Sequence, residues 1–159
     1  NKEKINRFKD KLKKNHTLEY YENIINAEII KANEKKRLLE LKDIDIAMQK
    51  KKHLYFEIGR FILTTPKNIR DMQHESNVLD HCLGKSMIKH YANEIVNKEG
   101  IILFLRDKEH IDEPYFTIEI KEGELVQCGT KKNQTDKNIT SLVQEFINTH
   151  KKEILAYTN

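Results

Sequence analysis

The sequence predicts an α+β protein in which N-terminal helices precede a small, mainly antiparallel sheet covered by helices. There is no Gly or Pro before Gly59, so nothing in the first third of the chain interrupts a helix. Residues 101–105 are all apolar, as in a strand buried on both faces. Residues 115–120 alternate in polarity, which is typical of a half-buried strand. We therefore expect a basic helical segment over 1–53 and an α+β domain over 54–159.

Two helices are expected in the first third. Thr17 is a suitable N-cap for the first, and apolar residues follow it at spacings of three and four up to Ala32. The second is expected over about 34–51, where Leu38, Leu41 and Met48 lie on one stripe.

Positive charge is concentrated in the helical segment. Residues 1–53 contain 15 Lys and Arg against 9 Asp and Glu, and the remaining residues contain 14 against 16. The basic residues cluster in 9–14, in Lys35, Lys36 and Arg37, and in Lys50, Lys51 and Lys52. Such clusters attract phosphate groups, which favours DNA or RNA as a partner. The alternative is an ordinary solvated helix face with interspersed acids.

The sequence indicates neither a membrane protein nor a secreted one. No segment approaches the ~18 apolar residues of a membrane span, and no apolar signal region is visible at the start. We expect a cytoplasmic location, and, because the first residue is Asn1, a piece of a longer protein. No feature of the sequence identifies a cofactor.

The α+β domain is expected to begin with one strand and one helix. Residues from Leu54 to Leu63 are rich in aromatic and branched types and predict a single strand bent at Gly59. Thr65 and Pro66 then predict a helix start, because Thr can cap and Pro is tolerated at the first helical position.

Two further helices are expected on the sheet. One runs over about 85–97, and the other starts at about Asp136. The apolar stripe of the last helix is Ile139, Leu142, Val143, Phe146 and Ile147.

The clearest hairpin lies between these helices, with Glu122 and Gly123 in its loop. A two-residue loop would give Glu122 a positive φ, so we expect a type I turn with Gly123 at a left-handed bulge position. The expected pairs are Ile118 with Val126, Phe116 with Cys128, and Thr117 with Gln127. This register gathers Thr117, Glu119 and Gln127 on a polar face.

Residues 79–84 read Leu-Asp-His-Cys-Leu-Gly. This segment resembles the HC[VL]G element of the PcfJ-like protein family. Supporting segments are 65–67, the apolar strand 102–106 ending in Arg, the Pro-Tyr-x-Thr-x-Glu strand 114–120, and the Val-Gln strand 125–129. The family usually has a Tyr soon after the glycine, and here the first is Tyr91. The resemblance implies a protein of conjugative plasmids, integrative elements or phages, and it brings no agreed activity.

The polar face suggests a site if the HC[VL]G segment lies across it. His81, Cys82, Glu119 and Gln127 would then be candidate catalytic residues, since His and Glu serve acid–base chemistry and Cys is a nucleophile. Cys82 at the start of the helix expected from about 85 would have its thiolate stabilised by the helix dipole. Arg106, which ends the neighbouring strand, is a candidate phosphate ligand.

Other interpretations remain open. His81 and Cys82 are also consistent with a packed core. Together with His90 and Cys128 they include the ligand types of a zinc site, without its short spacing. Asp107 or Asp112 with Glu119 and Lys121 weakly matches a nuclease pattern.

Three functions follow from these features. The leading hypothesis is an accessory protein of a mobile genetic element that binds nucleic acid or a nucleoprotein partner, such as another protein of the element. The competing hypothesis is an enzyme that processes nucleotides or nucleic acid in a His/Cys/Glu/Gln cleft. The third is a purely structural domain.

Overall fold

The computed structural model describes residues 2–12 and 17–158, and the chain divides into two compact units, 1–40 and 41–159. The first third forms helix α1 (Lys2–Leu12) and one long helix, α2 (Leu18–Gln49). The prediction of two separate helices over 17–51 is therefore wrong: 32 residues without Gly or Pro continue as one helix. In the first unit the apolar residues of α2 remain at the surface, and Leu18, Ile29 and Leu38 are exposed.

Five strands form one antiparallel sheet in the order β1-β2-β3-β4-β5. Their bounds are β1 Tyr55–Ile58, β2 Phe61–Thr64, β3 Ile101–Asp107, β4 Phe116–Lys121 and β5 Glu124–Gly129. The central strand is β3, and residues 101–106 are buried on both of its faces. The predicted α+β class and the buried central strand are confirmed.

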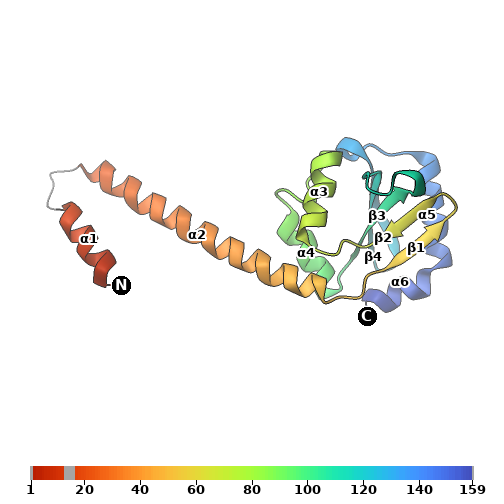
Figure 1. The fold of residues 1–159 in the computed structure, drawn as a ribbon, viewed down its shortest axis with the longest axis horizontal. Helices are drawn as coiled ribbons and strands as arrows, with labels where there is room; N and C mark the ends of the chain where they lie inside the picture. Colours follow the sequence, from red (N-terminus) through yellow and green to blue (C-terminus); the bar gives the residue numbers. More distant parts are fainter. Residues whose placement is uncertain (1, 13–16, 159) are drawn as a thin grey trace. The chain divides into compact units, whose positions relative to one another are not determined.

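The sheet of the second unit has helices on both faces (Figure 1). Helices α3 (Ile69–Leu79) and α4 (Ile88–Asn97) cover one face, and α5 (Lys137–Thr149) and α6 (Lys151–Thr158) cover the other. The core on the α3–α4 side is Met48, Ile69, Met72, Leu83, Ile88, Ala92, Ile95, Ile102 and Phe104. The core on the α5–α6 side contains, among others, Leu103, Ile118, Cys128, Val143 and Ile147. Each face of the sheet therefore has its own hydrophobic core.

The first strand predicted over 54–63 is a hairpin of β1 and β2. Ile58 pairs with Phe61, so Gly59 and Arg60 form a two-residue loop. Gly59 has a φ of +55°, as the first loop residue of a type II′ turn requires. The glycine therefore reverses the chain where the sequence predicted a bend.

Two helix starts lie later than predicted. Helix α3 begins after Asn68, whose side chain accepts a hydrogen bond from the amide of Asp71. Thr65 does not cap that helix. Its hydroxyl oxygen accepts a hydrogen bond from the amide of Leu54, which links the residues just before and just after the β1–β2 hairpin. Helix α4 begins at Ile88 rather than near 85. The start of α5 is confirmed, since Asp136 caps it.

The β4–β5 hairpin has the predicted polar face but a different loop and register, and Val126, which was expected to pair with Ile118 on the apolar face, does not lie there. Lys121 pairs with Glu124, so Glu122 and Gly123 form a two-residue loop with φ values of +52° and +74°. A bulge then leaves Val126 as the extra residue, 54% exposed. The observed pairs include Ile118 with Cys128 and Glu119 with Gln127. The predicted register is wrong because the positive φ of Glu122 is tolerated, and the bulge returns Gln127 to the polar face.

Candidate functional site

Polar residues of three strands lie side by side on the α3–α4 face of the sheet. Ile102 pairs with Glu119 across β3 and β4, and Glu119 pairs with Gln127 across β4 and β5. Thr117 lies two residues from Glu119 on the same face of β4, because side chains alternate along a strand. The sheet thus presents a carboxylate, an amide and a hydroxyl beside an apolar floor.

The segment between α3 and α4 lies over this row of residues. Helix α3 ends at Asp80 in the left-handed conformation, and the amide of His81 donates to the carbonyl of Ser76. Gly84 approaches the backbone of α3 so closely that a Cβ there would lie 2.4 Å from the carbonyl oxygen of Met72. The glycine of the HC[VL]G element is therefore required for the loop to dock.

A small pocket lies between this loop and the sheet. Its volume is about 30 Å³, enough for about one or two water molecules, and the empty space that includes its open mouth is about 350 Å³. The lining residues are His81, Cys82, Leu83, Tyr91, Ile102, Thr117, Glu119, Gln127, Gly129 and Asn133. The structure thus brings His81, Cys82, Glu119 and Gln127 together, as predicted from the sequence.

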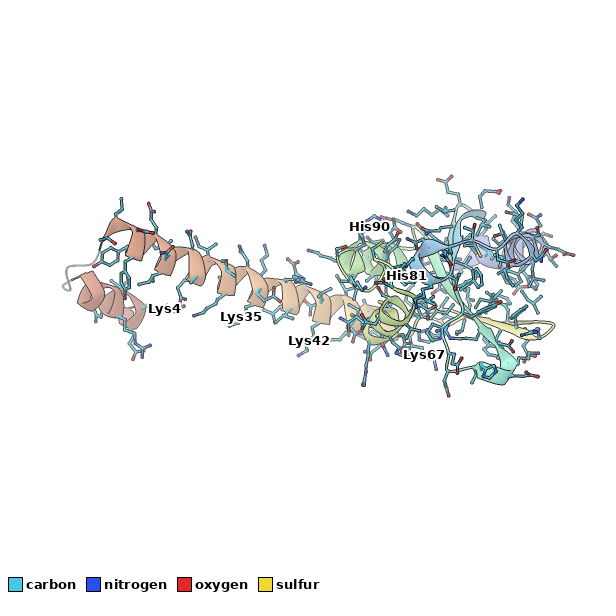
Figure 2. All side chains as sticks on the ribbon, turned by 90° about the horizontal axis from the view of Figure 1, so that it is seen from above. Lys4, Lys35, Lys42, Lys67, His81 and His90 are labelled. Carbon is cyan, nitrogen blue, oxygen red and sulfur yellow. The ribbon has the colours of Figure 1, made fainter. Side chains whose placement is uncertain are left out.

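The polar residues of the pocket differ in depth. His81 is 7% exposed and Glu119 is 8% exposed, whereas Cys82, Gln127 and Asn133 are exposed. In Figure 2, His81 lies between the α3–α4 layer and the sheet. The acid–base residues therefore lie at the bottom and the amide and thiol groups at the rim.

His81 belongs to a buried hydrogen-bonded chain. Its Nε2 lies 3.0 Å from Oγ1 of Thr117, whose hydroxyl lies 3.0 Å from Oε1 of Glu75. Arg106 binds both carboxylate oxygens of Glu75, donating to Oε1 over 3.1 Å and to Oε2. Burial lowers the pKa of His81 and raises the pKa of Glu75, the latter against the effect of Arg106. This chain holds the imidazole in one orientation.

Glu119 belongs to a second polar cluster. Its Oε1 lies 3.1 Å from Nζ of Lys121, which also binds Glu94 at 2.6 Å. The hydrogen bond to Glu94 raises the pKa of Lys121. Tyr91 lies nearby, and its pKa is raised mainly by burial and further by the charge of Glu119. Lys121 thus compensates two carboxylates, which allows Glu119 to be buried.

Arg106 does not line the pocket. Arg106 is 8% exposed, and its guanidinium is bound to Glu75 beneath α3. The geometry therefore makes Arg106 a partner of the His81 chain rather than part of the pocket wall.

The other basic residues named from the sequence do not line the pocket. Lys51 donates to the carbonyl of Ile95 and lies over the ring of Tyr157, and burial lowers its pKa. Lys50 and Lys52 are exposed. Lys35, Lys36 and Arg37 are exposed on α2, where Figure 2 labels Lys35. In the cluster over 9–14, residues 13 and 14 lie outside the described part of the chain.

The positions of the cysteines separate the proposed zinc ligands. Cys82 lines the pocket, whereas Cys128 is buried in the core on the opposite face of the sheet. Burial raises the pKa of the Cys128 thiol to about 11. Within the described residues, no group of three or more His, Cys, Asp or Glu side chains could hold a metal ion.

Two further expectations concern Cys82 and the nuclease pattern. Helix α4 begins at Ile88, so Cys82 is not in its first turn and the expected stabilisation by the helix dipole is wrong. Glu119 and Lys121 do form an ion pair, but Asp107 is paired with Arg60 at the other end of the sheet.

Sequence reasoning did not identify several residues of this site. Thr117 was placed on the polar face, but its link to Glu75 depends on α3, which is far away in sequence. Tyr91 was noted as the first Tyr after the family's glycine but was not predicted as a site residue, and it lines the pocket. Asn133 reaches the pocket from the short helix η2 (Lys131–Asn133), which no periodicity predicts.

The comparisons with known proteins place the chain in a family. The family model for PcfJ-like protein matches residues 3–143, most of the chain. The chain belongs to the PcfJ-like protein family. The match also covers most of the N-terminal helical segment, which the resemblance over 54–150 did not include.

One curated relative and no solved structure match the PcfJ-like chain. The uncharacterised protein Lin1253/Lin1744 of Listeria innocua is 30% identical over 98 residues, which is 62% of this chain and 21% of that protein. The aligned part thus spans about a fifth of the relative's length. No solved structure matches this PcfJ-like chain. In the described part of the chain, no helix is long and apolar enough to cross a membrane.

Proposed function

We propose that this PcfJ-like protein is a cytoplasmic accessory protein of a mobile genetic element and binds nucleic acid at the His81 pocket. The observation that carries the proposal is a polar pocket with basic residues at its rim. Lys131 and Lys132 precede Asn133, which lines the pocket, and both are exposed. Together with Lys85 they lower the pKa of Asp80, next to His81, with the ion pair between Lys85 and Asp80 contributing most.

Helix α2 is a less favourable site for phosphate than the sequence suggested. It contains five basic residues, Lys31, Lys35, Lys36, Arg37 and Lys42. It also contains seven acidic residues, Glu19, Glu22, Glu28, Glu34, Glu40, Asp43 and Asp45, so its formal charge is 5 − 7 = −2. The Lys36–Glu40 and Arg37–Glu34 ion pairs further occupy its positive groups. Lys131 and Lys132 have no ion-pair partner within the described residues, which leaves them available to phosphate.

Binding to labelled single- and double-stranded DNA and RNA over a salt series tests the proposal. We expect affinity to fall as salt rises, because phosphate contacts release counterions. The double variant Lys131→Gln/Lys132→Gln should reduce the slope of log K against log salt by about 1.4 on single strands, from ~0.7 per phosphate contact.

The matched control is Lys35→Gln/Lys36→Gln, which removes the same charge from α2 and should leave the slope nearly unchanged. Absence of salt-dependent binding at low ionic strength would contradict the proposed function. An equal decrease of the slope in both double variants would contradict the assignment of the phosphate contacts to Lys131 and Lys132.

A second candidate function is an enzyme that processes nucleotides or nucleic acid. The observation that favours it is the buried chain from Arg106 to His81, because an imidazole linked to a buried carboxylate is the arrangement of many general acid–base residues. Incubation with end-labelled strands and nucleotides tests it. Product formation that is abolished in the His81→Gln variant would support the enzyme hypothesis. If none of the strands and nucleotides is converted by the wild-type protein, the hypothesis is contradicted.

A further inference from the structure

The hydrogen-bonded chain determines which nitrogen of His81 carries the proton. Arg106 binds both oxygens of Glu75, which favours the carboxylate form, and the single hydroxyl hydrogen of Thr117 is donated to Glu75. The Thr117 oxygen must then accept a hydrogen from Nε2 of His81. Nδ1 of a neutral His81 is therefore unprotonated and acts as an acceptor.

That acceptor has no partner. Nδ1 of His81 is buried and makes no hydrogen bond within the described part of the chain. Buried polar atoms without partners are rare in native proteins, and each calls for an explanation such as a bound water or ligand. Here the atom belongs to a residue that lines a pocket.

Glu119 provides a second acceptor at the bottom of the same pocket. Its ion pair with Lys121 uses Oε1, and an ionised carboxylate accepts hydrogen bonds at both oxygens. Of the deepest polar groups, Nδ1 of His81 thus requires a hydrogen-bond donor, and the carboxylate of Glu119 can accept a further hydrogen bond. A phosphate group, which carries only acceptors at neutral pH, does not match them.

The other residues that line the pocket are suited to contact a flat aromatic ring such as a nucleobase. Leu83, Tyr91 and Ile102 provide apolar surface, and the amides of Gln127 and Asn133 lie at the exposed rim, where they can donate as well as accept. Proteins read unstacked bases with this combination of apolar contact and hydrogen bonds to the base edge.

We propose that the pocket receives the edge of an amino-bearing nucleobase, with guanine as the best fit, from a single strand whose phosphates lie along Lys131 and Lys132. This proposal rests on the proposed function. Guanine presents adjacent N1–H and N2–H₂ donors, adenine and cytosine one amino group each, and thymine and uracil one N–H. The pocket volume of about 30 Å³ suits an amino group rather than a whole base, so the ring would occupy the open mouth.

The test compares short oligothymidylates that differ in one central nucleotide: guanosine, adenosine, cytidine or thymidine. Fluorescence anisotropy at one salt concentration gives the affinity of the wild-type protein for each. We expect about tenfold tighter binding of the guanosine strand than of the all-thymidine strand, with adenosine and cytidine between them. Salt dependence, measured in parallel, reports on the phosphate contacts.

Two variants connect the base preference to the pocket. His81→Gln places an amide near Nε2 and keeps a donor toward Thr117 but removes Nδ1, and Glu119→Gln replaces an acceptor-only group. Both should lose the preference for guanosine and keep salt-dependent binding. The comparison of strands by the wild-type protein does not depend on how well either variant folds.

The outcomes separate the two proposals. Equal, salt-dependent affinity for all four strands would overturn the base site, would assign the pocket to ordered water only, and would leave nucleic-acid binding intact. Absence of binding to every strand would overturn both proposals. A guanosine preference that survives in folded His81→Gln and Glu119→Gln would place the base elsewhere.

Discussion

Arg106 and Glu75 form a bidentate ion pair inside the protein, and the Glu75 side chain is fully buried. The pair joins the central strand β3 to helix α3 and supports the Thr117–His81 end of the pocket. A buried carboxylate is tolerated only when it is paired and hydrogen-bonded. The stability of the domain and the geometry of the pocket therefore depend on the same contact.

Removal of either partner should strongly destabilise the protein. Arg106→Met leaves a buried carboxylate and Glu75→Met leaves a buried guanidinium, so each should lower the free energy of unfolding by about 3–5 kcal/mol. The double variant should lose less than the sum, because it leaves no unpaired charge. Urea unfolding measures all three. The control is Glu57→Gln, which breaks the exposed ion pair with Lys108 and should change the free energy of unfolding little. If the double variant loses as much stability as the two single variants together, the energetic pairing of Arg106 with Glu75 is contradicted.

Gly84→Ala should destabilise the loop that holds His81. The new Cβ would lie 2.4 Å from the carbonyl oxygen of Met72 and 2.5 Å from Cα of Gln73, both backbone atoms that cannot rotate away. Overpacking of this kind costs about 1–3 kcal/mol. Gly100→Ala, where the nearest atom is 3.4 Å away, is the matched control for unfolding measurements. Equal effects at the two positions would show that the close approach at Gly84 is unimportant.

The two cysteines should differ sharply in reactivity toward a thiol reagent such as DTNB. Cys82 is exposed, whereas Cys128 is buried and its thiol has a pKa of about 11, so at neutral pH it is protonated as well as inaccessible. We expect one fast-reacting thiol in the folded protein and the second only after unfolding in urea. Cys82→Ser should abolish the fast phase, and rapid modification of that variant would contradict the burial of Cys128.

His81 should make stability depend on pH. Burial lowers its pKa in the folded protein below the ordinary value of about 6.5, so between the two pKa values the folded state binds fewer protons than the unfolded chain. Its contribution to stability is present above about pH 6.5 and is lost as pH falls through the folded pKa. Glu75 acts in the opposite direction, since its raised pKa makes its contribution fade as pH rises.

His81→Gln removes only the first of these effects. The urea midpoint of this variant, followed from about pH 8 to pH 5, should fall less steeply than that of the wild-type protein. Parallel curves for the two proteins would exclude a buried neutral imidazole at position 81.

Local patterns in the sequence were sufficient for the α+β class, the buried central strand and the polar face of β4, but not for the bounds of every helix and strand. The alternation over 115–120 places Thr117 and Glu119 on one side of β4 in any register that keeps Gln127 out of the core, and the periodicity after Asp136 defines the buried stripe of α5. These features depend on neighbours within a few residues. Whether the HC[VL]G segment lies across that polar face was left open by the sequence, and the tertiary structure shows that it does.

Loop types, register and pairing required the tertiary structure. Glu122 adopts a positive φ that its own preference disfavours, and the bulge at Val126 then restores the faces of β5. Arg106 was expected at the pocket, but Glu75 lies 31 residues earlier in the chain and binds it beneath α3. A charged side chain takes the partner that best offsets the cost of leaving water, and only the packing of distant segments decides which partner that is.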